Sequence, residues 1–159
     1  TIAMIKQLIN QISDVISAPA TTDDEATRRE DAIRSATAVL MVDVARADYV
    51  FEDSEFDSVL RLVQIHFDLS AEEAAALVNA ADEEAERLTS LHEFTQLLHS
   101  NLDAREKARI VFLLWKIAYA DGRLDKYEDA LVLKISDLLH VSRGAVMRLK
   151  HEAGNGANA

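Results

Sequence analysis

The stretch Ala120-Asp121-Gly122-Arg123-Leu124-Asp125-Lys126-Tyr127-Glu128 joins two apolar helical patterns, and a second version lies 73 residues earlier, from Ala47 to Glu55. The acids are in register, since Asp48, Glu52 and Glu55 correspond to Asp121, Asp125 and Glu128. The apolar runs that precede them, 38–45 and 111–118, share one pattern. A motif that recurs at a fixed separation is typical of a repeated structural unit. We therefore predict two copies of a helix, acidic turn, helix unit, at about residues 38–70 and 111–142, related by a pseudo-twofold axis.

The composition predicts an all-α protein. The chain has 159 residues, of which 49% are hydrophobic, a length and apolar content that suit one domain with a sizeable core. It has a single proline and four glycines, and such a scarcity of turn formers favours helix over strand. We expect one helical-bundle domain over residues 1–152, with about seven or eight helices, followed by a flexible C-terminal tail at 153–159.

Apolar spacing and cap residues give the expected helix boundaries. Capping-box patterns, in which a hydroxyl or carboxylate precedes a Glu by three residues, occur at Ser70–Glu73, Ser90–Glu93 and Asp103–Glu106. Pro19 ends the first apolar pattern. The predicted helices are 2–18, 25–47, 54–67, 70–88, 90–100, 103–120, 126–139 and 142–151.

The net charge of −11 is unevenly distributed along the chain. Residues 20–90 carry eighteen acids and six bases, whereas the remaining residues carry ten acids and eleven bases. This balance argues against a nucleic-acid surface, which needs clustered Lys and Arg, and suits cations or a protein partner with a basic face. No apolar run approaches the length of a membrane span and no signal-peptide pattern is present, so we expect a cytoplasmic protein.

The six acids in register have two competing interpretations. Hard cations such as Ca²⁺, Mg²⁺ or Mn²⁺ take several oxygen ligands, and two acidic turns brought together would supply six carboxylates. The spacing is not that of an EF-hand loop. Alternatively, Asp125 and Glu128 cap the following helix, as Glu52 and Glu55 would in the first copy. Capping does not account for Asp48 and Asp121, because each follows a helix C-terminus, where an acid is electrostatically unfavourable.

The second copy, Ala-Asp-Gly-x-Leu-Asp-x-x-Glu followed by an apolar helix ending in Leu-x-Val-Ser, resembles the tellurite-resistance TerB-like family. Relatives of that family include the N-terminal region of a membrane-anchored DnaJ-type co-chaperone. The resemblance covers Ala38 to about Leu149 and is looser in the first copy, where Tyr49 replaces the Gly. It implies an all-α fold with an internal pseudo-repeat. It also implies a metal-binding or partner-binding face formed by Asp48, Glu52, Glu55, Asp121, Asp125 and Glu128.

Catalytic chemistry is not indicated elsewhere in the sequence. There is no cysteine, no nucleophile elbow and no glycine-rich phosphate loop, and the five histidines form no ligand pair by spacing. Trp115 is expected in the core. We therefore predict a non-enzymatic, divalent-cation-binding or stress-response adaptor. The alternatives are an interaction module whose acids cap helices or bind a basic partner, and a hydrolase that uses the same carboxylates.

Overall fold

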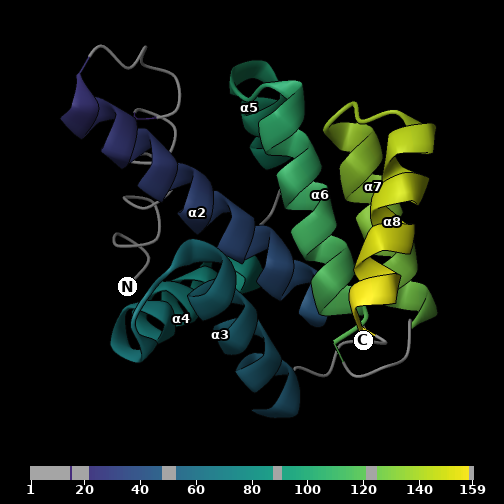
Figure 1. Ribbon diagram of the computed structural model, residues 1–159, viewed down its shortest axis with the longest axis horizontal. Coiled ribbons are helices and arrows are strands. Elements are labelled where there is room, and N and C mark those ends of the chain that lie inside the picture. Colours follow the sequence, from purple (N-terminus) through teal and green to yellow (C-terminus); the bar gives the residue numbers. More distant parts are fainter. Residues whose placement is uncertain (1–14, 16–21, 48–52, 88–90, 121–124, 158–159) are drawn as a thin grey trace.

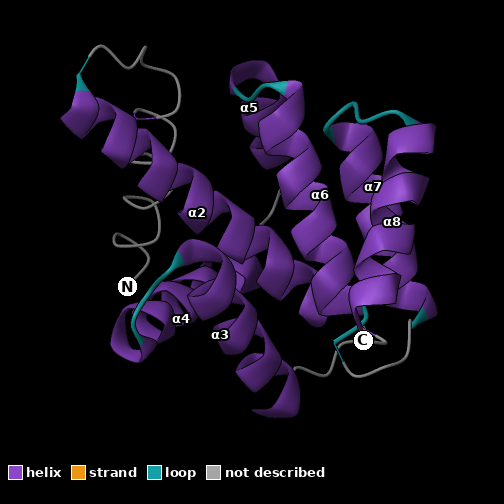
Figure 2. Ribbon diagram, viewed as in Figure 1, coloured by secondary structure: helices purple, strands orange, loops and turns teal. Residues whose placement is uncertain are grey.

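The computed structural model describes residue 15 and residues 22–47, 53–87, 91–120 and 125–157. Within these ranges every regular element is a helix, as the sequence predicts (Figures 1 and 2). The first predicted helix, 2–18, lies outside them except for Val15. The elements are α2 (Asp23–Ala45), α3 (Asp53–Phe67), α4 (Ala71–Arg87), α5 (Leu91–Asn101), α6 (Ala104–Ala118), α7 (Lys126–Leu138) and α8 (Arg143–Ala157). No helix among the described residues is long and apolar enough to cross a membrane.

Two of the predicted capping boxes define the beginnings of α4 and α6. At α6, the Asp103 carboxylate accepts a hydrogen bond from the Glu106 N–H at 2.8 Å, and Glu106 accepts one from the Asp103 N–H at 3.0 Å. Ser70 and Glu73 exchange the same two bonds at α4, at 3.1 and 3.0 Å. Each pair satisfies two N–H groups that the helix itself leaves without acceptors. These local contacts explain why the starts of both helices were predictable.

The core forms where α2 packs against α6. Residues 38–42 of α2 are fully buried, so this part of the helix is enclosed on all sides and lies in the centre of the molecule. Helix α2 also packs against α3 and α4, and α6 packs against α7 and α8 (Figure 1). Trp115 of α6 is fully buried, which confirms its predicted place in the core.

The two helical groups, α2–α4 and α6–α8, correspond closely along the chain. Helices α2 and α6 end 73 residues apart, at Ala45 and Ala118. Their C-cap residues have nearly equal φ angles, −93° for Arg46 and −95° for Tyr119. Helices α4 and α8 begin 72 residues apart, one residue out of the earlier register. These correspondences lie along the chain, and the repeat and its twofold symmetry stay predictions.

Helix α8 continues beyond its predicted end. The apolar spacing predicts an end near His151, but the helix extends to Ala157, so residues 153–157 are helical rather than part of a tail. Ala153 is fully buried, and a Cβ placed on Gly154 would lie 3.3 Å from the Tyr119 ring. Tertiary packing therefore overrides the weak helix propensity of the Gly-Asn-Gly sequence.

Candidate functional site

The acidic turns lie between corresponding helices along the chain. The first turn connects α2 to α3, and the second connects α6 to α7. Figure 1 shows the C-terminal ends of α2 and α6 near one another at the lower centre, and α2 also packs against α7. The helices that carry the turns are therefore in mutual contact, which is the arrangement that a shared site requires.

The structure describes the side chains of two of the six predicted site residues, Asp125 and Glu128. Glu55 lies at the start of α3, and its side chain is not described. Asp48, Glu52 and Asp121 lie outside the described residues. The convergence of all six acids therefore stays a prediction.

Asp125 is the N-cap of α7. Its backbone is extended, with φ −72° and ψ 140°, and its Oδ1 accepts a hydrogen bond from the Tyr127 N–H at 2.6 Å. In a capping box the bond would come from the N–H three residues on, at Glu128. The capping role is thus observed, but through the N–H two residues on. One carboxylate oxygen makes this bond, and the same side chain has a second oxygen that a cation or a donor can use.

Glu128 is the acid that the fold buries. It lies in the first turn of α7, and only 6% of its surface is exposed. A carboxylate is stable in such a place only when hydrogen bonds or positive charges compensate for the lost water. An acid that only caps a helix can stay exposed to solvent. Glu128 differs from such acids because it is buried directly after the second turn.

Asp43 is a further acid near the turns that the sequence interpretation missed. It lies in the last turns of α2, and burial raises its pKa, while the positive charges of Arg46 and Lys134 act in the opposite direction. Lys134 belongs to α7, which packs against the helix that carries Asp43. Its one sequence signal is an acid inside the apolar run 38–45.

Asp129 of α7 is not available to a site at the turns. It accepts a hydrogen bond from Lys150 Nζ of α8 at 2.8 Å, and both side chains are less than one-third exposed. The same ammonium group lies 5.0 Å from the centroid of the Trp115 ring. The contact ties α7 and α8 to α6, so this acid has a structural role.

Two histidines come together that the sequence did not pair. The rings of His99 and His140 stack with centroids 3.9 Å apart and planes 17° apart, and Lys107 Nζ lies 2.6 Å from His99 Nδ1. Ring nitrogens bind a metal in the plane of the ring, and stacked rings do not direct them to one point. Across the described residues there is no group of three His, Cys, Asp or Glu placed to hold a metal ion.

Comparison with known proteins gives one match. The family model described as tellurite resistance protein TerB matches residues 34–151, which is most of the chain. The matched range includes both acidic turns and all of α3 to α7. No curated protein and no solved structure matches the chain.

Proposed function

Because the chain belongs to the tellurite resistance protein TerB family, we propose that it is a non-enzymatic domain that binds a divalent cation through its two acidic turns. Family membership relates the chain to tellurite resistance, in a family whose members are generally non-enzymatic. The observation that carries the cation proposal is the packing of α2 against both α6 and α7, the helices on either side of the second acidic turn. A divalent cation takes several oxygen ligands, and the carboxylates of Asp125 and Glu128 at the start of α7 would supply some of them.

The arrangement of the helices favours one shared site over two separate ones. Helix α2, which precedes the first acidic turn in the chain, packs against both α6 and α7, the two helices that the second turn connects. Hard cations take six to eight oxygens, more than one turn provides. Ligands from both turns, Asp48, Glu52 and Glu55 with Asp121, Asp125 and Glu128, meet that number.

A second candidate function is that of a stress-response adaptor that binds a basic protein partner. It is favoured by the charge distribution, since residues 20–90 carry an excess of twelve acids over bases. Electrostatic association of this kind weakens steeply with added salt, whereas chelation by partly buried carboxylates is less sensitive. Salt dependence therefore separates the two functions.

The experiment is calorimetric titration of the metal-stripped protein with Ca²⁺, Mg²⁺, Mn²⁺ and Zn²⁺. The parent is compared with an Asp48→Asn/Asp121→Asn double variant and with Asp125→Asn. Asn is as good an N-cap as Asp, so Asp125→Asn removes the charge while it keeps the cap. Asp103→Asn, at the N-cap of α6, is the matched control outside the turns.

We expect saturable binding of one divalent ion by the parent and by Asp103→Asn. We expect a loss of about tenfold or more in affinity for Asp125→Asn, which is what removal of one charged contact costs. Equal binding by all variants would place the ion away from the turns. Binding of none of these ions would leave the basic-partner function, which binding to a polylysine peptide at low and high salt then tests.

A further inference from the structure

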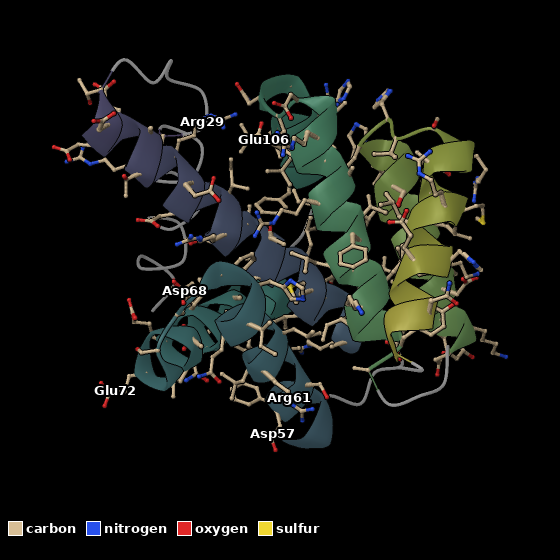
Figure 3. All side chains as sticks on the ribbon, viewed as in Figure 1. Arg29, Asp57, Arg61, Asp68, Glu72 and Glu106 are labelled. Carbon is tan, nitrogen blue, oxygen red and sulfur yellow. The ribbon has the colours of Figure 1, made fainter. Side chains whose placement is uncertain are left out.

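A cavity of about 360 Å³ lies between α2 and α6, away from the acidic turns. Its volume is within the ~300–1,000 Å³ range of small-molecule sites. Residues from α2, the end of α3 and the first part of α6 line it: Glu30, Ile33, Arg34, Thr37, Phe67, Arg105, Glu106, Arg109, Ile110 and Leu113. Figure 3 labels Glu106 on the α6 side and the neighbouring Arg29 on the α2 side.

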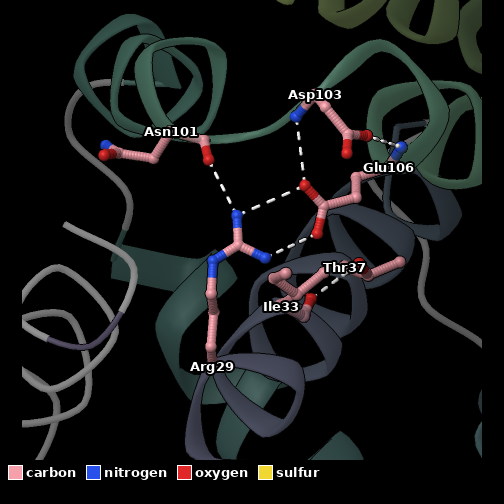
Figure 4. A network of polar contacts seen from close by, with 6 residues as sticks. All are labelled: Arg29, Ile33, Thr37, Asn101, Asp103 and Glu106. Atoms are coloured by element: carbon pink, nitrogen blue, oxygen red, sulfur yellow. Dashed lines mark hydrogen bonds and ion pairs between the residues drawn. The ribbon is translucent and has the colours of Figure 1, made fainter. Parts of the chain in front are cut away.

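The inner wall of the cavity is apolar. Ile33, Phe67, Ile110 and Leu113 line it, and each is at most 9% exposed. The Thr37 hydroxyl donates to the Ile33 carbonyl at 2.7 Å, so its hydrogen is already used within α2 (Figure 4). This wall therefore suits a hydrocarbon or aromatic group.

The Glu106 carboxylate beside the cavity is already neutralised. Its Oε2 accepts from Arg29 at 2.6 Å, and its Oε1 accepts from the other terminal nitrogen of Arg29 at 3.2 Å (Figure 4). The Asp103 N–H also donates to Oε1. Such a bidentate pair takes up the charge of both members. Of the charges that line the cavity, three guanidinium groups and the Glu30 carboxylate then remain.

Arg34 has a buried donor with no acceptor. Its Nε is buried and makes no hydrogen bond, although a terminal nitrogen lies 3.5 Å from Asp31. The guanidinium carbon lies 5.9 Å from the centroid of the Phe67 ring, which restrains its position. A buried N–H without an acceptor costs free energy. The Arg34 side chain as a whole is 30% exposed and lines the cavity, so its terminal N–H groups are the donors that an anionic oxygen there can reach.

The other two arginines leave further donors for an anion. Arg109 uses one terminal nitrogen, which donates to the His66 carbonyl at 2.8 Å. Arg105 is exposed and has no hydrogen bond or ion pair within the described part of the chain. A guanidinium has five N–H donors, so both can also contact a ligand.

We propose that this cavity binds a small organic carboxylate that has an apolar body. The body lies against Ile33, Phe67, Ile110 and Leu113, and the carboxylate accepts hydrogen bonds from Arg34, with Arg105 and Arg109 adding positive charge. Arg is suited to this role because its planar donor pair matches a carboxylate. None of these residues belongs to the acidic turns, so this binding and the cation binding stand or fall separately.

The test is a calorimetric titration of the parent protein with 2-naphthoate. Acetate, which has the carboxylate without the body, and 2-naphthylmethylammonium, which has the body with the opposite charge, are the comparison probes. We expect saturable one-site binding of naphthoate and no measurable binding of the other two probes. We expect Arg34→Gln to weaken naphthoate binding by about tenfold or more and Arg105→Gln by about two- to fivefold.

Arg61→Gln is the matched control, because Arg61 is exposed on α3 and lies apart from Arg29 and Glu106 in Figure 3. Arg105→Gln keeps the proposal testable even if Arg34→Gln does not fold, since its side chain makes no described contact on which the fold depends. Failure of naphthoate to bind the parent would overturn the proposal. So would equal affinity for the ammonium probe, or equal weakening by Arg61→Gln and Arg105→Gln.

Discussion

In each of the groups α2–α4 and α6–α8 the first helix packs against the third, but the side chains at the two contacts differ. In the first group, Arg46 donates to the Asp82 carboxylate of α4 at 2.6 Å. The corresponding residues of the second group are Tyr119 and Gly154, where the tyrosine ring lies over a glycine of α8. An ion pair and a ring against a glycine thus fill equivalent places. In both groups the first helix packs against the third, but different side chains make the contact.

The two groups also have different side chains at corresponding buried positions. Val42 of α2 corresponds to Trp115 of α6, and both are fully buried. The larger indole has the Lys150 ammonium over its face, and Lys150 is in turn paired with Asp129. The second group therefore concentrates more of its packing on one side chain than the first.

The largest expected effect comes from that difference. We expect Trp115→Ala to lower the free energy of unfolding by about 3–5 kcal/mol, through lost apolar contact and the cavity left behind. Val42→Ala removes less volume, and we expect a loss of about 1–3 kcal/mol. Urea denaturation followed by circular dichroism measures both. Equal losses at the two positions would show that Val42 and Trp115 contribute equally to the free energy of unfolding.

The contacts between first and third helices give the next effect. Tyr119→Ala should cost about 2 kcal/mol, a typical value for loss of a partly buried ring. Arg46→Ala should cost at most about 1 kcal/mol, because the Arg46–Asp82 pair is about one-third exposed and screened by water. Salt provides the control. The cost of Arg46→Ala should shrink between low and high salt and that of Tyr119→Ala should not, and the reverse pattern would contradict our assignment.

The starts of α4 and α8 give a smaller effect, which depends on pH. Ser70→Ala should cost about 1 kcal/mol because it breaks a capping box. Ser142→Ala should lower the stability by less. The Ser142 hydroxyl accepts one hydrogen bond, from the Ala145 N–H at 3.3 Å, and residue 145 has no carboxylate that could complete a capping box.

Hydrogen bonds from the Ser70 backbone and side chain lower the pKa of Glu73. A lowered pKa in the folded state adds stability above the ordinary value of 4.5, and this stability is lost as pH falls through the lowered value. The stability difference between the parent and Glu73→Gln should therefore disappear in acid. Urea midpoints measured from neutral pH to pH ~3 check this sign, and a difference that grows in acid would refute it.

The smallest expected effect is a change in the pKa of His99, and it comes from substitutions at the ends of α3 and α7. Asp68 and His140 both have positive φ, 53° and 60°, a conformation in which Gly is least strained. His140 also stacks on His99, whose pKa is lowered first by desolvation and then by the charges of Lys107 and His140. His140→Gly should therefore raise the pKa of His99, whereas Asp68→Gly should leave it unchanged. Nuclear magnetic resonance titration of the His99 ring measures this.

The lowered pKa of His99 also predicts how the stability of the protein depends on pH. Because folding lowers the pKa of His99, the folded protein binds fewer protons than the unfolded chain below the ordinary value of 6.5. The stability should fall as pH drops through that value, and it should fall less in His140→Gly. An unchanged slope in the variant would show that the stacked ring does not influence His99.

Local rules made most helix boundaries predictable. The starts of α4, α6 and α7 follow from Ser70, Asp103 and Asp125, whose side chains accept hydrogen bonds from N–H groups two or three residues away. Trp115 lies in the core, as expected from the sequence. In the candidate site, capping was one of the two interpretations of Asp125, and the structure shows this cap. The burial of Glu128 depends on how α7 packs, so spacing alone could not show it.

The sequence by itself determined the all-α class, the single apolar core and the correspondence of the two acidic turns, because these depend on periodicity and on contacts within a few residues. Only the tertiary structure decided that Arg29 pairs with Glu106, 77 residues away, that His99 stacks on His140, and that α8 continues past His151. Those outcomes depend on which helix faces meet. Local sequence patterns do not show which side chains far apart in the chain will be in contact, because those contacts form only when the helices pack.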